Sequence, residues 1–137
     1  MRPTNLPTRL AALGLLLAGT AAAQEFQPYP QPQVTPEQYA RYAEEVRQLH
    51  GATADVVPED NVIVFSDQRT RTFWIFTTKN NPAHPAWLTR QMVEENGQVR
   101  VRQIGYFAGS EAAFAKLFRA FQERNAKLME DVARRNQ

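Results

Sequence analysis

The stretch Thr72-Phe73-Trp74-Ile75-Phe76-Thr77-Thr78 decides the fold, because it is the densest run of aromatic and β-branched residues in the chain. Such residues favour a pleated, half-buried surface, so the run is predicted to be a strand. Residues 80–87 (NNPAHPAW) are polar and interrupted by proline, so they are predicted to be a loop. Including this strand, we expect four short segments between residues 61 and 107 to form an antiparallel sheet.

The first predicted hairpin joins residues 61–66 to residues 71–78. We expect Ser66 to pair with Arg71, which places alternate side chains of the two strands on opposite faces of the sheet. Apolar residues then occur on both faces, whereas an antiparallel pair usually keeps one face in water. The hairpin therefore carries more apolar surface than one covering layer can hide.

The second predicted hairpin turns at Asn96-Gly97, a dipeptide typical of two-residue turns. The turn sets a register in which Arg90 lies opposite Gln103 on an otherwise apolar face. We predict that this face belongs to the core, because it also carries Leu88, Met92, Val99 and Val101. The other face is predicted to be wet, because it carries Arg100 and Arg102, except where Trp87 lies opposite Tyr106.

Helical patterns precede and follow these strands. Thr35 is a good N-cap for the first helix, Gln38 completes a capping box with it, and apolar residues continue at helical spacing until Gly51. Residues 52–60 are predicted to be a loop in which Asp55, Glu59 and Asp60 are solvated. Ser110 is a good N-cap for the second helix, whose apolar stripe extends to Val132. We therefore predict an α+β domain in which a four-stranded antiparallel meander sheet is packed by an N-terminal helix and a longer C-terminal helix. Two helices on one side would leave one face of the first hairpin uncovered.

The N-terminal residues have the pattern of a secretory signal peptide. Arg2 and Arg9 precede an apolar segment at residues 10–19, and the small residues Ala21-Ala22-Ala23 follow. The alternative is an uncleaved membrane anchor, but an apolar segment of about 10 residues is too short for a bilayer, which needs about 20. We expect residues 1–23 to be removed, leaving a periplasmic or secreted protein without a membrane anchor.

The predicted mature chain has two parts. Residues 24–34 are rich in glutamine and proline, a composition typical of an extended tether. Residues 35–137 contain all the predicted strands and helices and are expected to form a single domain.

Composition restricts the kinds of partner and chemistry. The sequence has 16 Lys and Arg residues and 14 Asp and Glu residues, and loss of Arg2 and Arg9 makes these numbers equal. A neutral domain of this kind indicates no nucleic-acid partner. The absence of cysteine excludes disulfides and thiol chemistry. The two histidines, His50 and His84, have no metal-binding spacing, so we predict no metal and no cofactor.

Two polar side chains are candidates for catalysis. His84, framed by prolines in its loop, is a candidate general base, and Arg90 is a candidate anchor for an anionic group. Together they would suit a small hydrolase or lyase. We favour structural roles, in which His84 fixes the loop through a hydrogen bond and Arg90 is paired inside the domain, because an unpaired buried charge is costly.

An aromatic group is the leading candidate for a binding surface. Its side chains are expected to contact a protein partner or a small apolar ligand, although the same residues also suit a core. We predict a non-enzymatic exported binding domain, with the small hydrolase or lyase and a homodimeric structural protein as alternatives. The expected binding residues are Trp74, Phe76, His84, Trp87, Arg90 and Tyr106.

Residues 72–77, the segment Pro82-Ala83-His84-Pro85-Ala86 and the following Arg90 together resemble a pattern in small exported bacterial proteins of uncharacterised function. In those proteins a strand end that contains glycine, here Gly105 and Gly109, precedes a C-terminal helix. The resemblance covers roughly residues 65–121. It implies an envelope location and an α+β fold, and it implies no catalytic residues.

Overall fold

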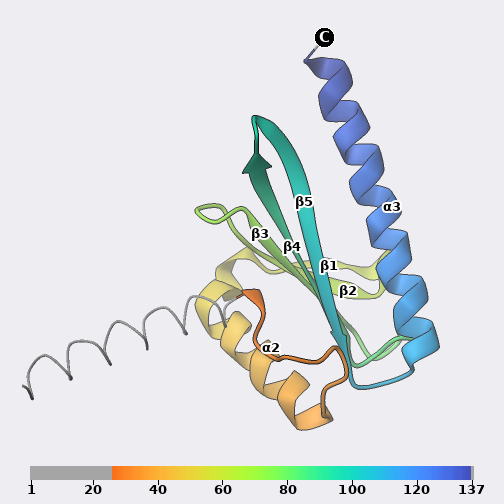
Figure 1. Ribbon diagram of the computed structural model, residues 1–137. Helices are drawn as coiled ribbons and strands as arrows, with labels where there is room; N and C mark the ends of the chain where they lie inside the picture. The colour runs from red at the N-terminus through yellow and green to blue at the C-terminus, as the bar shows by residue number, and fades with distance from the viewer. Residues whose placement is uncertain (1–25, 137) are drawn as a thin grey trace, which may run out of the picture. The chain divides into compact units, whose positions relative to one another are not determined.

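The computed structural model of the chain describes residues 26–136 (Figure 1). The predicted signal peptide, residues 1–23, lies outside the described residues. The chain divides into two compact units, Met1–Pro30 and Gln31–Gln137. The second unit has the predicted α+β class, with an antiparallel sheet and two long helices.

The sheet has five strands in the order β1-β2-β3-β4-β5. The meander order is as predicted, but the prediction of four strands is wrong. The additional strand, β1, lies in a segment predicted to be a loop and has only three residues, too few to show the alternation by which strands are recognised. The strands are β1 Asp55–Val57, β2 Val62–Asp67, β3 Thr72–Thr77, β4 Ala86–Glu95 and β5 Gln98–Phe107.

The β4–β5 hairpin has the predicted register, with Arg90 opposite Gln103. Asn96 and Gly97 have φ angles of 53° and 77°, and positive values at both positions are what a two-residue turn of this type requires. Glycine is needed at the second of these positions because L side chains rarely adopt that conformation. The hairpin therefore follows from the turn dipeptide alone.

The β2–β3 hairpin differs from the predicted register by two residues, because Ser66 pairs with Phe73 rather than with Arg71. Asp67 ends β2, and its carboxylate accepts a hydrogen bond from the Thr70 hydroxyl (3.2 Å). Arg71 has a φ of 55°, which places it in the turn instead of the strand. A shift of two residues keeps every side chain on its predicted face.

Helix α2 (Pro36–His50) begins as predicted. The Thr35 hydroxyl accepts a hydrogen bond from the Gln38 amide (3.0 Å), and the Gln38 side chain accepts one from the Thr35 amide (2.9 Å). This reciprocal arrangement is a capping box, which satisfies two amides at the helix end. Short 3-10 turns follow the helix at Gly51–Thr53 and, after β1, at Pro58–Asp60.

Helix α3 (Glu111–Arg135) begins after Ser110, whose hydroxyl accepts a hydrogen bond from the Ala113 amide (3.2 Å). Its first half packs on the sheet, whereas Leu128, in the second half, is 41 % exposed. The helix thus continues beyond the part of the sheet that it covers (Figure 1). The buried residues of α3 are Phe114, Phe121 and Asn125.

The two helices cover opposite faces of the sheet. Tyr42 of α2 stacks on Trp87 of β4, whereas Phe114 of α3 belongs to a core cluster with Ile75 and Leu88 on the other face. This corrects the expectation that one face of the first hairpin stays uncovered. The apolar residues of β3 alternate between the two faces, so each face needs its own covering helix.

Close approach of α3 depends on Gly105 of β5. A Cβ atom at this position would lie 2.6 Å from Cζ of Phe114 and 2.9 Å from Cδ2 of Leu88, which is closer than packed atoms approach. Glycine therefore leaves room for the Phe114 ring against the sheet. Gly105, the glycine that the resemblance placed at a strand end, therefore has a packing role.

Asp60 also holds α3 in place. Its two carboxylate oxygens accept hydrogen bonds from the Arg124 guanidinium (3.0 and 3.1 Å). Asp60 lies in a segment predicted to be a solvated loop, so this ion pair corrects that prediction. The contact joins the 3-10 turn before β2 to the middle of α3.

Residues 32–34 run beside the end of β5. The Val34 amide donates a hydrogen bond to the Phe107 carbonyl, and the Phe107 amide donates one to the Pro32 carbonyl, both at 2.9 Å. Gln33 and Phe107 thus form a parallel bridge. This part of the predicted tether is attached to the sheet.

Candidate functional site

The aromatic residues predicted to form a binding surface are packed in the interior. Trp74, Phe76, Trp87 and Tyr106 have exposed fractions of 1, 4, 0 and 3 %. The Tyr42 ring lies 4.8 Å from the Trp87 ring, centroid to centroid, and the Tyr42 hydroxyl accepts a hydrogen bond from Nε1 of Trp74 (2.9 Å). We therefore correct the expectation of an open aromatic face, because α2 covers it.

His84 has a hydrogen-bonded position in the loop before β4. Its Nδ1 lies 2.7 Å from the hydroxyl oxygen of Thr77. The same oxygen accepts a hydrogen bond from the Ala86 amide (3.0 Å) and donates one to the Ala86 carbonyl (3.1 Å). The Thr77 hydroxyl is thus shared between the His84 ring and the backbone of Ala86. His84 thereby holds the loop against β3.

Tyr39 of α2 lies against the same loop. Its hydroxyl donates a hydrogen bond to the Thr77 carbonyl (3.1 Å), and its ring meets the His84 ring edge-on with centroids 5.6 Å apart. Burial raises the pKa of the Tyr39 phenol above its ordinary value of 10.0. The hydroxyl therefore remains a donor at neutral pH, and His84 is held by residues on the α2 side.

Arg90 lies against α3, on the other side of the sheet. Its guanidinium donates a hydrogen bond to the side-chain oxygen of Asn125, and Cζ lies 5.6 Å from the centroid of the Phe121 ring. A reaction with His84 as base and Arg90 as anion anchor needs both groups beside one substrate. The structure does not bring them together, because His84 contacts α2 and Arg90 contacts α3.

A chain of polar contacts runs from Arg90 beneath α3. Asn125 accepts from Arg90 and donates to the side-chain oxygen of Gln103 (2.7 Å). Gln103 in turn donates to the Phe118 carbonyl of α3 (3.0 Å). Arg90 and Gln103, which were predicted to lie opposite each other within the apolar face, thus form a polar layer with Asn125 between the hairpin and α3. The internal partner expected for Arg90 is an amide.

The charge of Arg90 has no anion beside it. No salt bridge of the described residues involves Arg90, and its Nε atom is buried without a hydrogen-bond partner among those residues. Burial, together with repulsion from Arg124, lowers the pKa of Arg90. A partly buried cation without an anion is costly, so a carboxylate that reached this position would be bound favourably.

Apolar side chains continue past the polar layer on both the hairpin and α3. In a strand every second side chain points to the same face, so Met92 shares the face of Arg90. In a helix side chains three or four residues apart lie on the same side, so Leu128 and Met129 share the side of Asn125. Phe73, beside Arg90 on β3, is 39 % exposed. We call this region the α3–hairpin surface, comprising Phe73, Met92, Val99, Val101, Leu128, Met129 and Val132.

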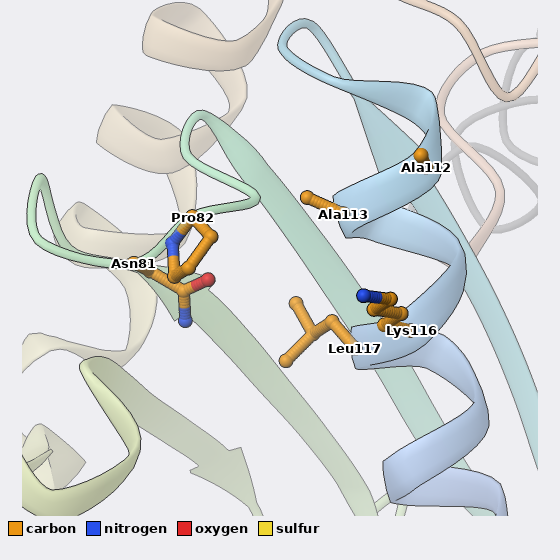
Figure 2. Close-up of a pocket in the computed structure, with 6 residues that line it drawn as sticks. All are labelled: Asn81, Pro82, Ala112, Ala113, Lys116 and Leu117. Carbon is orange, nitrogen blue, oxygen red and sulfur yellow. The ribbon is translucent and has the colours of Figure 1, made fainter.

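A separate hollow of about 410 Å³ lies between the loop after β3 and the first turns of α3 (Figure 2). The amide of Asn81 is used internally, because its oxygen accepts a hydrogen bond from the Ala83 amide and its nitrogen donates to the Asp60 and Asn61 carbonyls. Binding pockets usually have several convergent polar groups, whereas here Lys116 carries the only charge. The lining residues are Asn81, Pro82, Ala112, Ala113, Lys116 and Leu117.

Among residues 26–136, no cluster of three or more histidine, aspartate or glutamate side chains is arranged to bind a metal ion. No helix in that part of the chain is both long enough and apolar enough to cross a bilayer.

Asn125 is the site residue that sequence reasoning missed. It occupies the position four residues after Phe121 and three before Leu128, where the apolar stripe of α3 is expected to continue. An asparagine in such a stripe needs a polar partner on the opposite face. Arg90 and Gln103, already predicted to lie opposite each other within an apolar face, were the signal that would have identified that partner.

No protein-family model matches this chain, and no curated protein or solved structure is significantly similar to it. The resemblance to small exported bacterial proteins stays a prediction. Function is therefore inferred from the geometry of the residues described above.

Proposed function

We propose that this chain is an exported, non-enzymatic binding domain that contacts its partner through the α3–hairpin surface. The observation that carries the proposal is that apolar residues on two elements remain partly exposed where the buried core ends. Leu128 on α3 is 41 % exposed and Phe73 on β3 is 39 % exposed. Apolar side chains left exposed where a buried core ends are typical of an interaction site.

The α3–hairpin surface combines apolar area with one cation. Arg90 lies at its inner end, where Asn125 is its hydrogen-bond acceptor. A partner that offers an apolar segment with a carboxylate would therefore bury apolar area and supply an anion to Arg90 at the same time. We expect a protein partner, because the surface spans a hairpin and a helix.

The other parts of the proposal have different support. Export rests on the basic and apolar pattern of residues 1–23, and it stays a prediction. The hydrolase or lyase alternative is weakened because His84 and Arg90 contact different helices. The aromatic residues first expected to bind a partner support the domain from within, since Trp74 and Trp87 are buried.

Site-specific photo-crosslinking in the producing cell tests the proposed surface. A photoreactive residue replaces Val101 on the hairpin or Leu128 on α3, and the matched control replaces Leu49 of α2, an apolar residue that is 72 % exposed. We expect the same adduct from positions 101 and 128, because both sides of the surface contact one partner. Position 49 should give no such adduct.

Two results would contradict the proposal. An adduct that forms equally at position 49 would indicate non-specific contact of exposed apolar residues. The absence of any adduct from positions 101 and 128, in protein that is exported and folded, would show that the α3–hairpin surface meets no partner.

A further inference from the structure

We infer that the occupant of the α3–hairpin surface is a second copy of this chain, which docks the same face of its β4–β5 hairpin against the hairpin of the first copy. This inference rests on the proposed function and deepens it, because it uses the same surface and names the partner. Its basis is the order of charged and apolar side chains along one face of β4.

One face of β4 carries a cation, an apolar residue and an acid in succession. Arg90, Met92 and Glu94 are each two residues apart, so their side chains lie on the same face. At about 3.3 Å per residue, Arg90 and Glu94 stand about 13 Å apart with Met92 midway. Neither charged residue takes part in a salt bridge of the described chain.

This order of side chains is self-complementary about a two-fold axis. When two such faces meet with their β4 strands antiparallel and the axis near Met92, Arg90 of each copy meets Glu94 of the other copy. On the neighbouring strand, Val101 lies opposite Met92 and Val99 lies opposite Glu94. The centre of the contact is therefore apolar, and an ion pair flanks it on each side.

The second copy completes the site of Arg90. Within one chain the guanidinium has an amide oxygen as acceptor and a buried Nε without a partner. The acid at the hairpin tip, Glu94, is exposed and lies too far along the strand to turn back to its own Arg90. Antiparallel docking brings the tip of one hairpin toward the inner end of the other, where the cation lies.

The last turns of α3 add apolar side chains to the same contact. Asn125 is the last buried residue of the helix, and Leu128 beyond it is 41 % exposed. Leu128, Met129 and Val132 follow on the stripe that faces the sheet. A second copy docked at the α3–hairpin surface would cover these three residues together with Met92 and its apolar neighbours.

Charge exchange, measured by sedimentation equilibrium of the protein purified after export, tests the inference. The parent should form a dimer that weakens as salt is added. Glu94→Arg should raise the dimer dissociation constant about a hundredfold, because it places two like charges opposite each other. Arg90→Glu should have a similar effect. An equimolar mixture of the two variants should associate again, since each supplies the charge that the other lacks.

The matched control is Arg100→Glu, an exposed change on the other face of the same hairpin, which should leave the dissociation constant unchanged. Thermal unfolding shows that each variant is folded. If Arg90→Glu does not fold, the test uses Glu94→Gln and Glu94→Arg instead. We expect the dimer dissociation constant to rise with Glu94→Gln and to rise further with Glu94→Arg. A parent-like constant for Glu94→Arg, or a mixture of folded variants that does not associate, would overturn the inference.

The outcomes also separate this inference from the proposed function. A parent that is monomeric at every concentration, while positions 101 and 128 crosslink to one other protein, would overturn the second copy as the occupant and leave the binding surface in place. A monomeric parent without any crosslink would overturn both. Crosslinks at twice the mass of the chain would support both.

Discussion

The two ends of the β4–β5 hairpin differ in how completely they are covered. Near β3 and the termini of the hairpin strands, Trp87 and Leu88 lie on opposite faces and both have an exposed fraction of 0 %. Toward the turn, Met92 and Val101 are only partly buried. One end is thus enclosed by two helices, whereas the other is only partly covered. The enclosed end supports the stability of the domain, and the partly covered end carries the surface that we propose for binding.

The largest effect is expected at the enclosed end. Trp87→Ala removes a fully buried ring that stacks on Tyr42 and Tyr106, so it should lower the free energy of unfolding by about 3–5 kcal/mol. Chemical denaturation monitored by far-UV circular dichroism measures this. A loss below about 1 kcal/mol, the usual scale of a surface change, would contradict this expectation, because Trp87 would then not be part of a tightly packed core.

An intermediate effect is expected at the polar layer between the two ends. Asn125→Ala removes the acceptor of Arg90 and the donor to Gln103, so it should lower the free energy of unfolding by about 1–3 kcal/mol. The control is Gln122→Ala, an exposed position on the same helix. The double variant with Arg90→Met should lose less than Asn125→Ala, because a buried cation is no longer left without a partner. An equal or larger loss would contradict this role of Arg90.

A smaller effect is expected where α3 is attached at its exposed side. Asp60→Asn removes an ion pair whose side chains are 30 % and 49 % exposed, so it should lower the free energy of unfolding by about 0.2–1 kcal/mol. The loss should shrink in high salt, because salt screens exposed charges. Unfolding curves at two ionic strengths measure it. A loss that does not depend on salt would mean that the carboxylate acts in another way.

The smallest effect on stability is expected at the open end. Leu128→Ser, at a residue that is 41 % exposed, should change the free energy of unfolding by no more than about 0.5 kcal/mol, while it weakens self-association. Paired measurements of denaturation and sedimentation test both expectations. If Leu128→Ser destabilised the monomer strongly, the last turns of α3 would belong to the core and the proposed surface would be lost.

Local signals predicted most of the fold. The Asn96-Gly97 turn set the register of β4 and β5, and the Thr35–Gln38 capping box set the start of α2. The strand β1 was missed because three residues carry too little pattern. The register of the first hairpin was wrong by two residues, because the role of Asp67 in holding its turn is visible only once the Thr70 hydroxyl is placed.

The candidate site was harder to predict, because it depends on which face each helix covers. The apolar stripe of a helix shows that it packs, but it does not show on which side of a sheet it lies. Once α2 covers Trp74 and Phe76, those aromatic residues belong to the core. Arg90 was correctly identified as an unusual residue on an apolar face, whereas its contact with Asn125 depends on the placement of α3 over the hairpin.

The margins of the sheet have a consequence for how chains of this protein can aggregate. Outer strands are where β proteins add to one another into fibres. Here one margin is β1, only three residues long, and at the other margin residues 32–34 occupy the end of β5. Arg100 and Arg102, both exposed, interrupt the rest of β5 with charge. Fibre growth is thus discouraged at both margins, and a contact between faces about a two-fold axis closes after two chains.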